Sequence, residues 1–188
     1  MPLLRRWTDS YARTSMNIYV ASSWRNPWQP GVVKLLRNAG HEVYDFREPV
    51  PGERGFAWSD IDPEWQEWRP EVYRKALNHK VAKHGFMRDM TALRNCTACV
   101  MVLPCGNSAN LETGWAAGAM KKTAALFPYG VPITPIGGHS VSGRACAPCG
   151  DMDGCWLPGK LKKIEPELMT KMADVILLDA EELLQWVE

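Results

Sequence analysis

The chain has 188 residues, 46% of them hydrophobic, and a formal net charge of +1 at pH 7. This length and composition are typical of one domain with a sizeable core, and the near-neutral charge argues against a nucleic-acid polymer as partner. No apolar run approaches the roughly 20 residues of a membrane-spanning helix, and residues 1–15 lack the apolar segment of a signal peptide. We therefore expect a cytoplasmic protein that acts on a small molecule and does not enter a membrane.

The first 15 residues are basic and polar, and the pattern of a strand begins only after them. We interpret residues 1–15 as an N-terminal arm and residues 16–188 as a single domain. An equal alternative is a short helix, built on Leu3, Leu4 and Trp7, that docks on the domain or on a neighbouring subunit.

The domain opens with a β-α-β pattern. An apolar strand starts at residue 17, and a helix with apolar residues over 32–36 ends at the sequence Asn38-Ala39-Gly40. Residues 41–46 then alternate as a second strand. The connection over 49–70 is long for a compact domain, which is typical of a functional or interfacial loop.

Three tryptophans lie in that connection. Trp58 could stack on a nucleobase as part of a lid, whereas Trp65 and Trp68 are at helical spacing, which favours packing. The alternative is that these indoles fill a subunit interface or cover the sheet.

The second half of the chain continues the alternation of strands and helices. We predict a helical stretch over 71–95, strands over 100–103, 123–127 and 175–178, an irregular insertion over about 129–160, a short helix over 165–172, and a last helix capped by Asp179. This spacing predicts an α/β fold. We expect a three-layer, Rossmann-like or flavodoxin-like open parallel sheet of about five strands with helices on both faces.

A tight loop of small residues follows the strand over 100–103 and leads into a helix that Ser108 or Asn107 can cap. Glu112 falls in the first turn of this helix, at the edge where open parallel sheets bind ligands. A carboxylate there either stabilises the helix dipole or serves a function. The side of the helix that we expect to pack on the sheet also carries Leu111, Trp115, Ala116 and Ala119.

A second carboxylate, Asp89, lies on the same side of its predicted helix as Phe86, Met90 and Leu93. That side is apolar, so we expect Asp89 to face the sheet rather than water. An Asp in such a place is often a structural group, and the residues by themselves leave both roles open.

Three segments, in this order, resemble the nucleoside 2-deoxyribosyltransferases and their nucleotide N-glycosidase relatives. Residues 17–24 (NIYVASSW) resemble the family's first strand and ligand loop, and residues 88–96 (RDMTALRNC) resemble its helix with an Asp ahead of the third strand. The sequence ETGWAAGA followed by two lysines, starting at Glu112, resembles the family's Glu-Leu-Gly-Tyr-Ala-x-x-x-Gly-Lys segment. The resemblance covers about residues 16–127.

The resemblance implies cleavage or transfer at the N-glycosidic bond of a (deoxy)nucleoside or nucleoside 5′-monophosphate. Glu112 would be the nucleophile beneath the sugar, kept ionised by a pKa that the helix N-terminus lowers. Asp89 would protonate or hydrogen-bond the departing base. We expect no metal and no cofactor, and a homo-oligomer, dimer or higher, in which a neighbouring subunit completes the pocket. The expected substrate-binding residues are Tyr19, Ser22, Ser23, Trp24, Trp58, Gly106, Asn107 and Ser108.

The loop before Glu112 departs from the family pattern. Deoxyribosyltransferases carry there an Asp that contacts the sugar, whereas this chain has Cys105-Gly106-Asn107-Ser108. Ser22, Ser23 and Ser108 could instead hold a 5′-phosphate beside a helix start, as in the nucleotide-hydrolysing relatives. Ordinary loop and capping chemistry is the alternative.

Two other functions stay open at this point. One is hydrolysis of NAD or another nucleotide, which also needs a Glu under a ribose, although the chain has no G-x-G-x-x-G loop. The other is a module that binds a nucleotide without turning it over.

Five of the six cysteines fall into two groups, and the sixth, Cys105, lies in the loop before Glu112. Cys96 and Cys99 flank the start of an apolar strand, and we expect them to be buried as small apolar residues. The second group has the donor types of a zinc site but a spacing that matches no zinc-finger pattern, so a metal-free segment is the alternative. Its members are Cys146, Cys149 and Cys155, with His139 upstream.

Overall fold

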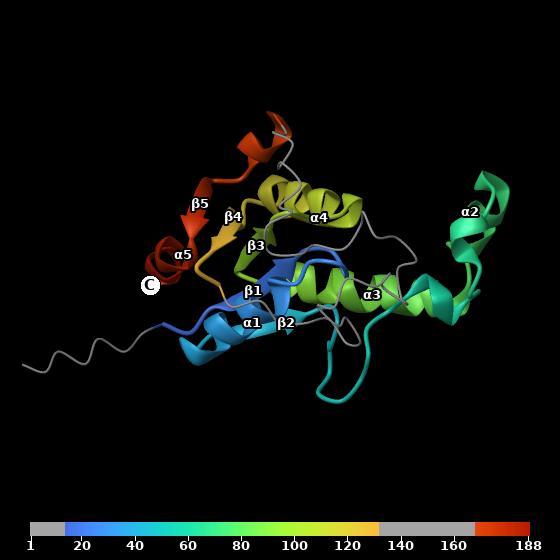
Figure 1. Cartoon of the computed structure of the whole chain (residues 1–188), viewed down its shortest axis with the longest axis horizontal. Helices are drawn as coiled ribbons and strands as arrows, with labels where there is room; N and C mark the ends of the chain where they lie inside the picture. Colours follow the sequence, from blue (N-terminus) through green and yellow to red (C-terminus); the bar gives the residue numbers. More distant parts are fainter. Residues whose placement is uncertain (1–13, 132–167) are drawn as a thin grey trace, which may run out of the picture.

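The computed structural model describes residues 14–131 and 168–188, and within them the chain forms one five-stranded sheet (Figure 1). Every strand pairs in parallel, in the order β2-β1-β3-β4-β5. This confirms the predicted open parallel sheet of five strands. The strands are β1 (Asn17–Ala21), β2 (Glu42–Asp45), β3 (Ala98–Val102), β4 (Lys122–Tyr129) and β5 (Val175–Asp179).

Helices cover both faces of the sheet, which makes the predicted three layers. Buried residues of α1 and α5 share one core with one face of the sheet, and buried residues of α3 and α4 share a second core with the other face. A further helix, α2, stands away from the sheet (Figure 1). The helices are α1 (Gln29–Asn38), α2 (Pro70–Ala76), α3 (Lys80–Asn95), α4 (Asn107–Gly118) and α5 (Ala180–Val187), with 3₁₀ turns η1 (Trp58–Asp60), η2 (Trp65–Glu67) and η3 (Leu168–Met172).

The central strand β3 is buried along its whole length, and its alternate side chains serve the two cores. Val100 and Val102 pack in the core of α1 and α5, whereas Cys99 and Met101 pack in the core of α3 and α4. A strand covered on both faces needs a continuous apolar sequence, and this strand has one. Cys96 and Cys99 are buried free thiols, as predicted.

Two local sequence signals are confirmed. Helix α1 ends before Gly40, whose φ of +94° lies in the left-handed region that favours glycine. Asp179 caps α5 by accepting hydrogen bonds from the backbone N–H groups of Glu181 and Glu182, both at 2.9 Å.

Two predicted helices differ from the structure. The stretch over 71–95 is not one helix, because α2 ends at Ala76 and α3 begins at Lys80, with His79 capping α3 through the backbone N–H of Val81. The described part of the helix predicted over 165–172 is the 3₁₀ turn η3. Propensity indicated helix in both places, and neither the cap at His79 nor the tighter turn has a strong sequence signature.

Several predictions lie outside the described residues. They include most of the N-terminal arm, most of the insertion over about 129–160, and the zinc candidates Cys146, Cys149, Cys155 and His139. Among the described residues, no helix is long and apolar enough to cross a membrane.

Candidate active site

Glu112 lies on the side of α4 that packs against the sheet. Ala109, Thr113 and Ala116 are buried on that side, and Glu112 is half-buried among them at the same helical spacing. The small alanines let the helix approach the sheet closely. A carboxylate is therefore held in an apolar layer between α4 and the strands.

The structure corrects where α4 begins and which side it buries. Its N-cap is Gly106, without a side-chain cap, so neither Asn107 nor Ser108 is the cap; both are exposed helical residues. Glu112 is consequently the sixth helical residue and lies in the second turn, not the first. Three of the residues expected on the sheet are instead exposed to solvent, namely Leu111, Trp115 and Ala119.

The electrostatics of Glu112 also differ from the expectation. Burial and, after it, the nearby Asp89 charge raise the pKa of Glu112 to about 7, and the Tyr19 hydroxyl opposes both effects. The expected lowering by the helix N-terminus is wrong, because helix-end effects fade within the first turn and desolvation dominates. Glu112 is thus a carboxyl that titrates near neutral pH.

Tyr19 occupies the middle of β1 with a fully buried side chain. Its hydroxyl oxygen makes no hydrogen bond of ordinary geometry within residues 14–131 and 168–188. Burial is the main cause that raises the Tyr19 pKa, followed by the charges of Glu112 and Asp89. Leaving a buried hydroxyl unpaired costs about 1–3 kcal/mol, so a polar ligand group that pairs with Tyr19 would be favoured.

Asp89 faces the sheet from α3, as predicted. The hydroxyl of Tyr44, on β2, donates to its Oδ1 at 2.5 Å. Burial raises the Asp89 pKa, while the Tyr44 hydrogen bond and the Arg88 charge lower it. The expected neighbour Phe86 does not share this side, because it is 61% exposed.

Two tyrosines link the carboxylates across adjacent strands. Tyr19 and Tyr44 are paired in register, and their rings stack with centroids 5.2 Å apart and planes 19° from parallel. One tyrosine is next to Glu112 and the other holds Asp89. The structure therefore brings together three residues that the sequence singled out, and it adds Tyr44, which sequence reasoning missed.

The loop after β1 contains the other predicted ligand residues. Ser22 is buried and donates to the carbonyl of Val102 at 3.0 Å, so its hydroxyl proton is already used. Ser23 lies against Gly106, since a Cβ on that glycine would meet the Ser23 Cβ at 3.8 Å. Trp24 is 37% exposed and packs edge-on against Phe46. The loops after β1 and β3 are thus neighbours at the carboxyl edge of the sheet.

Asn26 and Arg47 fix this edge, and sequence reasoning missed both. The fully buried Asn26 amide donates to the carbonyls of Val102 and Pro104 at 3.1 and 3.0 Å. The Arg47 Nη2 donates to the carbonyls of Ser23, Trp24 and Asn26 at 2.8–2.9 Å. An Asn-Pro pair after a strand is a recognisable turn signal, whereas nothing local marks Arg47 as the partner of another loop.

Trp58 belongs to an aromatic cluster beside α3. Its ring contacts are with Phe56, Trp68 and Tyr73, at centroid distances of 4.8–5.6 Å, and none of these contacts is with Glu112 or Asp89. The cluster is anchored to α3 at Gly85, where an added Cβ would come within 2.8 Å of Phe56. Trp58, for which we considered stacking on a nucleobase, thus packs against Trp68.

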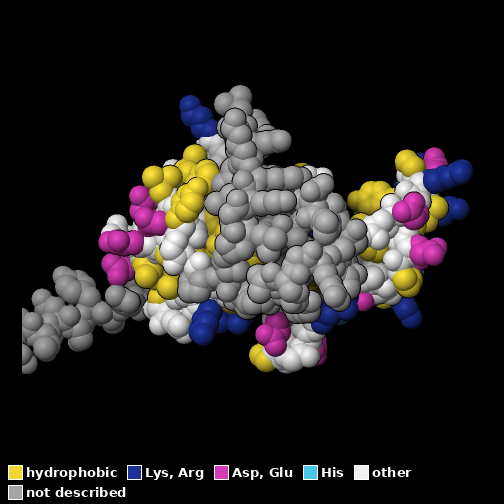
Figure 2. Space-filling model, in the orientation of Figure 1, with side chains coloured by type: hydrophobic (Ala, Val, Ile, Leu, Met, Phe, Trp, Pro, Cys, Tyr) yellow, Lys and Arg dark blue, Asp and Glu magenta, His cyan; other side chains and the backbone are white. Residues whose placement is uncertain are grey.

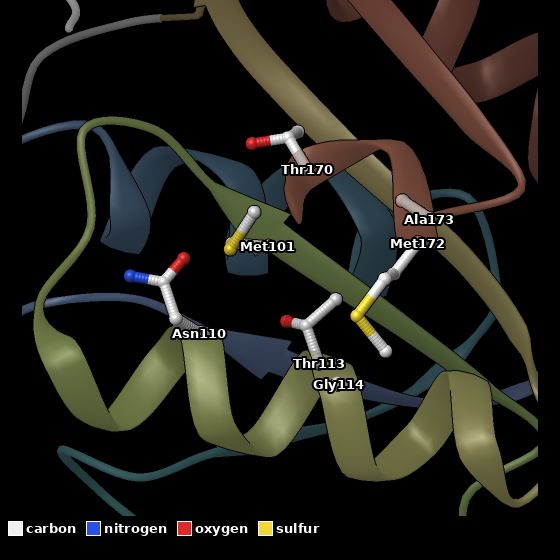
Figure 3. A pocket seen from close by; sticks show the side chains of 7 residues that line it. All are labelled: Met101, Asn110, Thr113, Gly114, Thr170, Met172 and Ala173. Carbon is white, nitrogen blue, oxygen red and sulfur yellow. The ribbon is translucent and has the colours of Figure 1, made fainter. Parts of the chain in front are cut away.

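A cavity of about 260 Å³ lies between α4, β3 and η3, and none of the predicted site residues lines it (Figure 3). Asn110, Thr113 and Gly114 reach it from α4, Met101 from β3, and the remaining lining residues from the η3 segment. Its walls carry no charge, which suits it poorly to a phosphate. Within the described residues, no group of three or more His, Cys, Asp or Glu side chains could hold a metal ion.

Comparison with models of known protein families gave no match for this chain. Comparison with curated proteins gave none either.

Proposed function

We propose that the protein cleaves or transfers at the N-glycosidic bond of a (deoxy)nucleoside or nucleoside 5′-monophosphate, with Glu112 as the nucleophile. The observation that carries the proposal is a carboxylate held against the sheet beside the buried Tyr19 hydroxyl and a second carboxylate, Asp89. The resemblance of residues 16–127 to the nucleoside 2-deoxyribosyltransferases supports the same reaction.

Glycosidic cleavage needs an anion below the sugar and a proton donor at the base. An ionised Glu112 attacks C1′ and forms an ester, while the C1′–N bond breaks and its electron pair goes to the base nitrogen. Asp89 gives its proton to that base. Attack of water on the ester then makes the protein a hydrolase, and attack of a second base makes it a transferase.

The reaction requires one proton on the carboxyl pair, with Glu112 ionised and Asp89 protonated. Burial raises the pKa of each group, and the Asp89 charge raises that of Glu112 further. Two such groups lose their protons in coupled steps. In the free protein the Asp89 charge raises the Glu112 pKa, so the proton of the pair is on Glu112, and the proposed reaction requires substrate binding to move that proton to Asp89.

A 5′-phosphate would lie at the start of α4. Gly106, Asn107 and Ser108 provide the free backbone N–H groups of a helix N-terminus, and Ser23 is next to them. Ser22 is less suited, because its hydroxyl donates to a backbone carbonyl. Nucleoside monophosphates are therefore the preferred class of substrate in this proposal.

The direct test is to incubate the protein with deoxynucleosides, deoxynucleoside 5′-monophosphates and NAD, each with and without free adenine. We expect free base or exchanged nucleoside from the wild type, and none from Glu112→Gln. Glu42→Gln, an exposed change at the start of β2, is the matched control. Release of nicotinamide alone would favour the NAD hydrolase, and a tightly bound nucleotide without product would favour a binding module.

The proposal includes a homo-oligomer. Hydrophobic side chains lie on the surface of the lobe that holds α2 (Figure 2). Val72, Tyr73 and Leu77 there are 45–47% exposed, and Phe86 and Met87 on α3 are more so. Exposed apolar groups of this kind often mark a protein interface. Light scattering should give a mass above that of one chain, and a monomer would contradict this part.

We also propose that the protein acts in the cytoplasm. The buried thiols of Cys96 and Cys99 form no disulfide, which agrees with a reducing compartment.

A further inference from the structure

Tyr44 is the residue that connects the sheet to Asp89. It lies on β2, stacks on Tyr19, and donates its hydroxyl to Asp89 Oδ1 at 2.5 Å. Asp89 Oδ2 accepts no hydrogen bond from the described residues. The Tyr44 hydroxyl therefore fixes one oxygen of the carboxyl and leaves the second without a hydrogen bond from these residues.

The surroundings of Asp89 come from four elements. Tyr44 on β2 and Arg88 on α3 lower the Asp89 pKa and so favour its anion. Tyr19 on β1 is near both carboxylates, because the charges of Glu112 on α4 and of Asp89 each raise its pKa. The Tyr44 hydroxyl itself keeps its proton, since burial and the Asp89 carboxylate both raise its pKa. Tyr44 thus serves as a hydrogen-bond donor to Asp89 and not as a base.

We propose that Tyr44 is a positioning residue for the reaction: it holds Asp89 with one oxygen free toward the departing base and stabilises the anion left when Asp89 gives up its proton. This inference rests on the proposed function. Without the Tyr44 hydroxyl, Asp89 would be a weaker acid and its carboxyl could rotate. Cleavage would then slow for a base that must take up a proton as it leaves, but not for a base that leaves without one.

Two substrates that differ in whether the departing base must take up a proton distinguish these two cases. Deoxyguanosine 5′-monophosphate needs a proton on its base when the C1′–N bond breaks. Its N7-methyl analogue already carries a cationic base and needs none. A defect confined to Asp89 slows the first substrate only, whereas a general structural defect slows both.

The test compares the wild type, Tyr44→Phe and Tyr129→Phe on both substrates. Tyr44→Phe keeps the stacked ring and removes only the hydroxyl; Tyr129 is an exposed tyrosine at the end of β4. We expect Tyr44→Phe to lose about 10- to 100-fold in kcat/KM on the unmodified nucleotide, the value of one hydrogen bond to a charged group. On the N7-methyl analogue it should lose less than about threefold, and Tyr129→Phe should match the wild type on both.

Two results would overturn the role of Tyr44: equal losses on both substrates, or no loss on either. Failure of the wild type to release base from both would instead refute the proposed function, and this inference with it. The Asp89 pKa can also be measured without any reaction, which tests the role of Tyr44 separately from the proposed function. Carboxyl-¹³C NMR should show a higher Asp89 pKa in Tyr44→Phe than in the wild type, and an unchanged Asp89 pKa would show that Tyr44 does not act on it.

Discussion

Replacing Glu112 with Gln should stabilise the folded protein above neutral pH, because the native carboxylate is held where its charge is poorly solvated. Burial and the Asp89 charge raise the Glu112 pKa from 4.5 to about 7. Each pKa unit corresponds to about 1.4 kcal/mol of interaction. The ionised side chain therefore destabilises the fold by about 3 kcal/mol relative to its protonated form.

The sign and the pH range follow from the two pKa values. The pKa in the folded protein is higher than in the unfolded chain, so stability is greatest below about pH 4.5 and is lost as pH rises through about 7. The Gln side chain carries no charge at any pH. We expect Glu112→Gln to exceed the wild type by about 2–3 kcal/mol at about pH 8, and by about 1 kcal/mol or less at about pH 5.

The assay is urea unfolding of both proteins across this pH range, with equal m-values as the check that the unfolding reactions are alike. Glu71→Gln is the matched control, since it removes an exposed Glu from α2. A gain for Glu112→Gln that does not change with pH, or a loss at about pH 8, would refute the argument that burial and charge set the Glu112 pKa.

Three further substitutions test how the edge of the sheet and the last helix are built. Asn26→Ala removes the hydrogen bonds to the carbonyls of Val102 and Pro104, of which the Val102 carbonyl still accepts from Ser22, and should destabilise the protein by about 2–4 kcal/mol in urea unfolding; a cost near zero would show that these bonds do not hold the loop. Gly55→Ala would place a Cβ 1.7 Å from the Phe46 carbonyl oxygen and should lower the Tm markedly, whereas Gly118→Ala, with open space around it, should not. Asp179→Ala should cost about 1 kcal/mol through loss of the α5 cap, and Asp179→Asn should retain most of that stability; equal losses would contradict the capping role.

Much of the fold could be predicted from local patterns. The apolar run of β3 and the alternation of strands and helices gave the parallel sheet, because a strand covered on both faces needs a continuous apolar sequence. Gly40 and Asp179 marked helix ends through backbone chemistry that is local to those residues. Such signals depend on a few neighbouring positions, so a sequence is enough to find them.

The site was harder to predict because it depends on contacts between distant segments. Glu112 was found, but its environment was not, since its burial between α4 and the sheet and the nearby Asp89 charge depend on how distant segments pack. Tyr44 reaches Asp89 across 45 positions, and Arg47 reaches Ser23 across 24. Pairings of that kind follow from strand register and loop packing, which no local pattern carries.

The most direct measurement of the central claim is the mass of the intact protein after incubation with a 2′-fluorinated deoxynucleoside monophosphate, whose fluorine slows hydrolysis of a glycosyl ester. We expect one sugar phosphate to become attached to the wild type, peptide mapping to place it on Glu112, and Glu112→Gln to gain nothing. Attachment to another residue, or release of base from the wild type without any adduct on Glu112, would contradict Glu112 as the nucleophile.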